Sequence, residues 1–237
     1  MSLPADLQAW RFLDELDVAR DAAGQMARDL ELLDEVGAGR APVVRFYRWH
    51  PPALSLGRFQ PEEDVDREAC ARLGVEIVRR PTGGRALLHG GDLTYAAAFP
   101  WELGPGSTVE DRYRWIAGGL VDGLGRLGVP AAVGRSDGSP GVVCFAGQQG
   151  ADLRVGERKV CGSAQVQRDG AVLQHGSVLL TRLAFDETML LHTDLTSARL
   201  RERTATLEEL GAPTGHRVVA AALAEGLAHV LGSGDRA

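Results

Sequence analysis

Three arginines and two glycines lie close together in the run Arg79 to His89, which reads RRPTGGRALLH. Glycines in such a turn let a ligand approach the backbone, and guanidinium groups bind phosphate or carboxylate in a bidentate manner. The run lacks the spacing of a P-loop and that of a dinucleotide-binding turn. The two glycines alone fit a surface turn between strands equally well, and a histidine such as His89 is by itself more often structural than catalytic.

A second group of reactive residue types begins at Cys144 and continues through Lys159 to His175. Lys159 is the single lysine among 26 basic residues, and a compact ammonium can take a position that a planar guanidinium cannot. A lysine beside a carbonyl stabilises developing negative charge, and a nearby cysteine thiolate can be acylated. On the residues alone, Lys159 is equally a solvated hairpin residue retained by chance, and Cys70, Cys144 and Cys161 are all packing residues.

Composition excludes several classes of function. With 237 residues, 44% of them hydrophobic, the chain can build one core, so we expect a single domain over 1–237. The net charge of -6 argues against a dedicated nucleic-acid binder. The longest apolar stretches, such as Val218 to Leu231, fall short of the ~20 residues of a membrane span. Three cysteines fit neither a disulfide framework nor the spacing of a metal site. We therefore expect a cytoplasmic protein without a metal, nucleic acid or membrane.

The elements that must position these residues follow from hydrophobic periodicity. Trp10 to Val36 is predicted to be one long amphipathic helix, with Asp29 on its charged face. Further helices are expected over 61–73 and 109–127, and a helical segment from about 188 to 231 with a joint at 211–215. Strands are expected over 43–49, 53–57, 75–79, 93–99 and 171–180, with a loop over 82–91 whose residues 86–89 are apolar, a short extended segment over 143–145 and a hairpin over 152–161. Strands mixed with long helices and joined by hairpins indicate an α+β fold.

Three ordered motifs resemble the lipoate-protein ligase and octanoyltransferase family of the biotin/lipoate ligase superfamily. They are Arg79 to His89 with Asp92 to Tyr95, Lys159 to Gln165, and Leu173 to Ser177, and the resemblance extends to most of the chain. It implies a mixed, largely antiparallel sheet flanked by helices. It also implies an acyl chain in a tunnel closed by the glycine-rich loop, with an activated octanoyl or lipoyl carbonyl near Lys159.

Two chemistries occur in this family, and the sequence is more similar to the cysteine-dependent one. ATP-dependent ligases typically carry a third glycine where this chain has Arg85, and many have a separate C-terminal accessory domain, which we do not expect here. Cysteine-dependent transferases carry Thr82 in the loop and a Cys-Phe pair ahead of the lysine motif, which Cys144 and Phe145 match. The resemblance thus implies Cys144 as the nucleophile and Lys159 as the group that polarises the carbonyl.

The resemblance further implies substrates and alternatives. The expected reaction moves an octanoyl or lipoyl group from acyl carrier protein to a lysine of a lipoyl domain, as in glycine cleavage H protein or the acyltransferase subunit of a 2-oxoacid dehydrogenase. Such a transferase requires no cofactor, whereas an ATP-dependent lipoate-protein ligase, the alternative, requires ATP and Mg. A non-catalytic acyl-binding relative is the third hypothesis, supported only by Gly90 and Ala96, where the family usually has an acidic residue and often a serine. The implied substrate-binding residues are Arg79, Thr82, Gly83, Gly84, Arg85, His89, Gly162, Ser163, Ala164 and His175.

Overall fold

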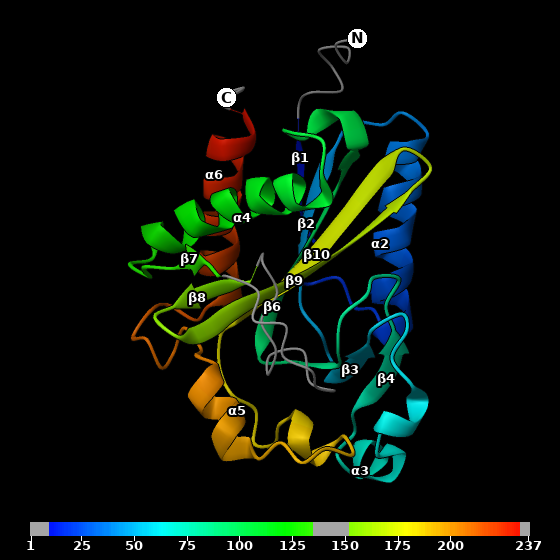
Figure 1. Cartoon of the computed structure of the whole chain (residues 1–237), viewed down its shortest axis with the longest axis vertical. Helices are drawn as coiled ribbons and strands as arrows, with labels where there is room; N and C mark the ends of the chain where they lie inside the picture. The colour runs from blue at the N-terminus through cyan, green and yellow to red at the C-terminus, as the bar shows by residue number, and fades with distance from the viewer. Residues whose placement is uncertain (1–9, 135–151, 233–237) are drawn as a thin grey trace.

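The computed structural model describes residues 10–134 and 152–232, and within them the strands form two sheets (Figure 1). The larger sheet has the order β1-β2-β6-β10-β9-β8-β7, and only its β1–β2 pair is parallel. Its strands are β1 (Arg11–Asp14), β2 (Val43–Tyr47), β6 (Asp92–Pro100), β7 (Ala132–Val133), β8 (Leu153–Val155), β9 (Arg158–Arg168) and β10 (Ala171–Leu179). The smaller sheet has the order β4-β3-β5, with β3 (Ala53–Leu56), β4 (Glu76–Arg79) and β5 (Leu87–His89). The α+β class and the largely antiparallel sheet are confirmed.

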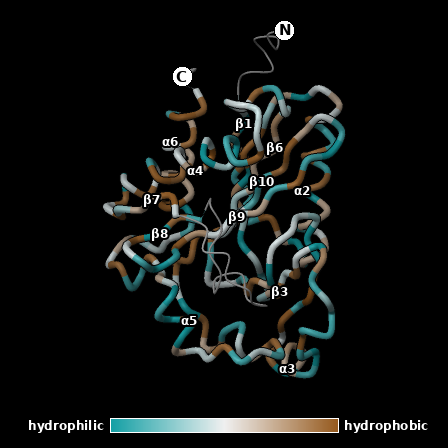
Figure 2. Tube along the Cα trace, in the orientation of Figure 1, coloured by the Kyte–Doolittle hydropathy of each residue, from teal (hydrophilic) through white to brown (hydrophobic). Residues whose placement is uncertain are grey.

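Alternation along the central strands gives the large sheet two different faces. On β6, Leu93 and Tyr95 face the core formed with α4 (Val109–Arg126) and α6 (His216–Gly232), whereas Ala96 and Ala98 face α2 (Ala22–Gly37). Hydrophobic residues run along α6, which packs against α4 (Figures 1 and 2). The α2 face of the sheet is therefore the one left for the small sheet and for a site.

Close helix contact depends on small residues where α4 crosses α6. A Cβ at Gly123 would lie 2.7 Å from the Ala222 carbonyl oxygen, and one at Gly119 would lie 2.7 Å from a Leu227 methyl carbon. Any side chain at these positions would force the helices apart. Together the helices close the face of the large sheet that is opposite the site.

The small sheet packs with several short helices into a hydrophobic cluster separate from the core between α4 and α6. They are α3 (Arg67–Arg72), α5 (Ser197–Arg203) and the 3-10 helices Glu62–Asp64 and Glu187–Met189, and another 3-10 helix, Trp101–Leu103, follows β6. Leu54, Leu88 and Leu200 join this cluster. Gly74, with a φ of 64°, follows α3 as expected for a helix C-terminus.

Three sequence-based expectations were wrong in extent. Residues 11–14 form strand β1 rather than the start of the first helix, because their pairing with β2 is a long-range contact that local periodicity does not report. The expected helix over 61–73 is divided into a 3-10 turn and α3. The segment from 188 is not continuously helical: beyond α5, the amides of Ala205, Leu207 and Glu208 donate to the carbonyl oxygens of Lys159 on β9, Leu179 on β10 and the following Leu180. The expected extended segment 143–145 lies outside the described residues. Over 10–134 and 152–232, no helix is long and apolar enough to cross a membrane.

Candidate functional site

A pocket opens between the α2 face of the large sheet and the small sheet, and we call it the inter-sheet pocket. Six of the sequence-predicted residues line it: Gly84, His89, Gly162, Ser163, Ala164 and His175. They come from the glycine-rich loop and from β5, β9 and β10, so the fold brings the three sequence motifs together. The other lining residues are Met26, Tyr47, Trp49, Ser55, Arg80, Leu87, Thr94, Asp152, Gly176 and Ser177.

Lys159 lies outside the lining of this pocket and is joined to it by a buried ion pair. Its Nζ lies 2.8 Å from Oδ2 of Asp152, and each side chain is 2% exposed. Asp152 itself lines the inter-sheet pocket. A buried pair of this kind fixes the ammonium in one position. The solvated hairpin residue that the sequence allowed is therefore excluded for Lys159.

Arg80, which the sequence analysis did not single out, organises the glycine-rich loop. Its guanidinium Nη2 donates at 2.8 Å to the carbonyl oxygens of both Gly83 and Arg85, and Nη1 donates at 3.0 Å to that of Ser55. Gly84 between them has a φ of +94°, and a Cβ there would lie 2.7 Å from Arg80 Nη2. The loop thus surrounds the buried guanidinium of Arg80, and only glycine at position 84 leaves room for it.

The remaining loop residues from the sequence analysis lie around the pocket rather than in its lining. The exposed Arg79 donates at 2.8 Å to the carbonyl oxygens of Gly57 and Gln60, on the opposite side of β4 from Arg80. Arg85 is exposed and Gly83 is half-buried. Alternation along β4 is the signal that could have separated Arg79 from Arg80.

His175 is held at both ring nitrogens. Nδ1 lies 3.0 Å from Asp29 Oδ2, and Nε2 lies 2.7 Å from the Thr82 hydroxyl. Thr82 is buried in the glycine-rich loop, although it does not line the pocket. His175 thereby ties the loop to the interior of the molecule.

Asp29 on α2 belongs to a buried network of charged side chains that includes Arg45 on β2. Arg45 is fully buried and donates to Asp29 Oδ1 at 2.7 Å and to Glu15 Oε2 at 2.7 Å. Burial opposes ionisation of Glu15, but the charges of Arg45, Arg20 and Arg28 together outweigh it and lower the pKa of Glu15. Burial, together with the Asp29 carboxylate, raises the pKa of Tyr47, whose hydroxyl donates to that carboxylate at 3.0 Å. Asp29 was expected on a charged, exposed helix face, and its complete burial corrects that expectation.

His89 belongs to a second buried network at the pocket. Its Nε2 lies 2.9 Å from the Ser55 hydroxyl and its Nδ1 lies 2.9 Å from Asp92 Oδ2, while Trp49 stacks on the ring at a centroid distance of 4.2 Å. Burial opposes ionisation of Asp92, yet the charge and hydrogen bond of His89 lower its pKa. Both histidines of the motifs are therefore oriented by carboxylates.

Gly90, which follows His89, adopts a backbone conformation that favours glycine. Its φ is +128°, and its amide donates at 2.9 Å to Asp92 Oδ1. A residue with a side chain would be strained in that conformation. The departure from the family pattern at Gly90 is thus accommodated by a local backbone conformation and by Asp92.

Two of the cysteines are packing residues. Cys70 is 1% exposed and Cys161 is fully buried, and burial raises the pKa of the Cys70 thiol. Cys144, the proposed nucleophile, lies outside the described residues. Within the ranges that are described, no cluster of three or more histidine, cysteine or acidic side chains is placed to hold a metal ion.

Comparison with known proteins agrees with this geometry. Residues 21–227 match the family model of the lipoyl protein ligase A/B catalytic domain. The chain belongs to this family. Among curated relatives, the octanoyltransferase LipM of Symbiobacterium thermophilum is 40% identical, with 94% of this chain and 86% of that protein covered. The octanoyltransferase LipM of Kyrpidia tusciae is 37% identical, with 96% and 89% covered.

A solved structure extends the comparison to the fold. The putative lipoate protein ligase Ta0514 of T. acidophilum, with bound lipoic acid, superposes with a TM-score of 0.75 at 26% identity and covers 94% of this chain and 85% of its own. The family and the fold inferred from the motifs are therefore confirmed.

Proposed function

We propose that this enzyme transfers an octanoyl group to a lysine of a lipoyl domain in lipoate biosynthesis, through an acyl-enzyme on Cys144. The observation that carries the proposal is the buried Lys159–Asp152 pair at the wall of a pocket built from all three motifs. Relatives named octanoyltransferase at 37% to 40% identity over nearly the whole chain support the same reaction. The octanoyl chain would lie in the inter-sheet pocket.

The reaction proceeds in two steps. The Cys144 thiolate attacks the carbonyl carbon of an octanoyl thioester, and the carbon–sulfur bond of the donor breaks to release its thiol after protonation. The ε-amine of the acceptor lysine then attacks the Cys144 thioester, forms an amide, loses a proton and returns the thiolate. Each step passes through an oxyanion, and the Lys159 ammonium stabilises it by an amount on the order of 2.7–4 kcal/mol if it acts like one oxyanion-hole donor.

The histidines have positioning roles in this scheme. His175 and His89 each use both ring nitrogens in protein contacts. They hold the glycine-rich loop and the pocket wall rather than transfer protons. Thr82, Gly83 and Gly84 would close over the acyl chain. Arg80 would hold this loop in place through its hydrogen bonds to the carbonyl oxygens of Gly83 and Arg85.

Acyl carrier protein is the proposed donor, and the lipoyl domain is the acceptor class that the reaction requires. No cofactor takes part in either step of the transferase scheme. The similarity to a lipoate protein ligase with bound lipoic acid favours a second candidate, an ATP-dependent ligase that acts through an acyl-adenylate.

One experiment separates the two candidates. The protein is incubated with apo lipoyl domain and either octanoyl-acyl carrier protein without ATP, or free octanoate with ATP and Mg. We expect intact-mass analysis to detect octanoylated lipoyl domain in the first reaction only. Product that forms only with free acid and ATP would establish the ligase instead.

A further inference from the structure

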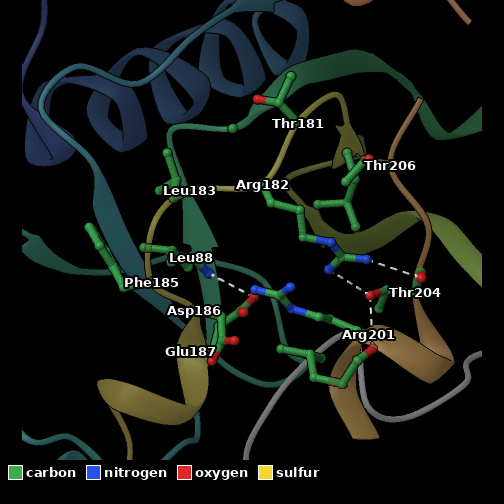
Figure 3. Close-up of a pocket in the computed structure, with 13 residues that line it drawn as sticks. Leu88, Thr181, Arg182, Leu183, Phe185, Asp186, Glu187, Arg201, Thr204 and Thr206 are labelled. Atoms are coloured by element: carbon green, nitrogen blue, oxygen red, sulfur yellow. Dashed lines mark hydrogen bonds between the residues drawn. The ribbon is translucent and has the colours of Figure 1, made fainter. Parts of the chain in front are cut away.

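A second hollow, which we call the α5 cleft, lies between β5, the end of β10 and α5 (Figure 3). Its apolar wall consists of leucine and phenylalanine side chains, and its polar wall of threonine, acidic and arginine side chains. The lining residues that matter here are Leu88, Leu179, Thr181, Glu187, Arg201 and Thr204. Leu88 belongs to the run Arg79 to His89, whereas the other five lie outside the sequence motifs, and the proposed chemistry uses none of the six.

The α5 cleft continues the line of the inter-sheet pocket along one strand. His175 and Ser177 line the pocket, whereas Leu179 and Thr181 line the cleft. Alternate residues of an extended strand point to the same face, at about 7 Å per pair. His175, Ser177 and Leu179 therefore place part of each hollow on the α2 face of β10, with the cleft at the end of the strand.

Lys159 contacts one lining residue of each hollow. Its backbone bridges that of Thr204, a cleft residue, and its carbonyl oxygen accepts from the Ala205 amide at 2.9 Å. Its ammonium meanwhile binds Asp152 at the wall of the pocket. A carbonyl beside this ammonium would thus lie at the wall of the inter-sheet pocket, next to the strand whose backbone borders the α5 cleft.

Arg201 is a second arginine in the lining of the cleft, beside Arg182. It is exposed, its guanidinium extends across the cleft toward Asp186 and Glu187, and within the described residues it forms no ion pair or hydrogen bond (Figure 3). By contrast, Arg182 is neutralised by Glu209 at 2.8 Å and donates to the Thr204 hydroxyl at 3.0 Å. Within the described residues, the cleft thus combines an apolar wall with one arginine fixed by Glu209 and one, Arg201, whose guanidinium has no hydrogen-bond or ion-pair partner.

We propose that the α5 cleft binds the phosphopantetheine arm of the acyl donor, with Arg201 pairing with its phosphate. This inference rests on the proposed thioester transfer. An octanoyl thioester has an apolar chain on one side of its carbonyl and, on the other, an arm with methyl groups, two amides and a phosphate. The chain would lie in the inter-sheet pocket and the carbonyl beside Lys159. The arm would lie between the leucine and threonine walls of the cleft, and the phosphate at Arg201. A nucleoside monophosphate is the competing occupant.

The test compares two donors that differ only in the phosphate, octanoyl-phosphopantetheine and octanoyl-pantetheine. Because a hydrogen bond to a charged group contributes enough for a tenfold or larger effect, Arg201→Glu should lower kcat/KM for the phosphorylated donor by at least about tenfold. It should change kcat/KM for octanoyl-pantetheine by less than about twofold. Arg201→Lys should restore most of the loss, since it keeps the charge. Equal effects on both donors, or none on either, would overturn the proposal.

Arg199→Glu is the matched control, because Arg199 is an exposed residue of the same helix that does not line the cleft. It should leave the ratio between the two donors unchanged; an equal loss of that ratio would indicate general surface charge. Calorimetric titration with free 4′-phosphopantetheine and with AMP makes the result independent of turnover. Binding of phosphopantetheine that Arg201→Glu weakens supports the inference even if the transfer reaction fails. Binding of AMP alone contradicts it.

Discussion

The carboxylate of Asp29 lies 3.0 Å from Nδ1 of His175, so a residue of helix α2 orients a motif histidine on β10. The Nδ1 that faces the carboxylate is placed to carry the ring proton, which leaves Nε2 to accept from the Thr82 hydroxyl at 2.7 Å. The glycine-rich loop is thereby coupled, through one imidazole, to a charge network buried under the sheet.

Asp29→Asn should be strongly destabilising. Arg45 would keep its ion pair with Glu15 but lose the Asp29 carboxylate at 2.7 Å, which also binds His175 and Tyr47, so we expect a loss of roughly 3–5 kcal/mol in the free energy of unfolding. Urea denaturation measures it. Asp34→Asn in the same helix is the control, because Asp34 is 63% exposed and should cost less than about 0.5 kcal/mol. Similar values for the two variants would show that the buried network contributes nothing particular.

Gly84→Ala and Gly83→Ala should behave differently although the residues are adjacent. A Cβ at Gly84 would meet the Arg80 guanidinium at 2.7 Å in a left-handed conformation, whereas a Cβ at Gly83 meets no atom within 4 Å. We expect Gly84→Ala to displace Arg80 and weaken octanoate binding at least tenfold, with a stability loss of about 1–3 kcal/mol. Calorimetric titration with octanoate compares the two. Equal affinities would remove the loop from the acyl site.

Lys159→Arg should abolish transfer while conserving charge. The larger, planar guanidinium cannot take the place of an ammonium that is 2% exposed beside Asp152. We expect the rate of octanoyl transfer to fall by about 10²–10³-fold. Arg158→Lys on the same strand, at a side chain 40% exposed, should stay near the normal rate. Near-normal transfer by Lys159→Arg would make Lys159 a structural residue only.

Glu187 predicts a specific pH dependence of stability. Burial raises its pKa from 4.5 to about 7, so the folded state binds its proton more tightly than the unfolded state. Its contribution is fully present below pH 4.5 and is lost as the pH rises through about 7, a difference of about 3 kcal/mol. Glu187→Gln keeps an acceptor for the Leu88 amide and should flatten that slope, with the largest gain over the wild type at pH 8. An unchanged slope in urea denaturation between pH 5 and 8 would contradict the assignment.

Periodicity and motifs were sufficient to predict which segments of the chain carry the candidate functional residues. The glycine-rich turn, the hairpin with Lys159 and the strand with His175 all lie where alternation and turn residues indicated. The burial of Cys70 and Cys161 was also correct.

What the sequence could not predict depends on long-range contacts. Asp29 has the spacing of a solvated helix residue, and only its partners Arg45 and His175, far away in the chain, explain its burial. Asp152 likewise becomes a partner of Lys159 only when β8 folds back on β9. The α5 cleft could not be predicted because its residues come from three separate segments of the chain that share no motif.

The central claim is that Cys144 carries the octanoyl group. Intact-mass analysis after incubation with octanoyl-acyl carrier protein should show one covalent octanoyl adduct on the wild type, on Cys70→Ser and on Cys161→Ser, and none on Cys144→Ser. The adduct should disappear, with octanoylation of the lipoyl domain, when apo lipoyl domain is added. Octanoylation of the lipoyl domain at an unaltered rate by Cys144→Ser, above all one that requires ATP, would contradict the acyl-enzyme and favour the ligase.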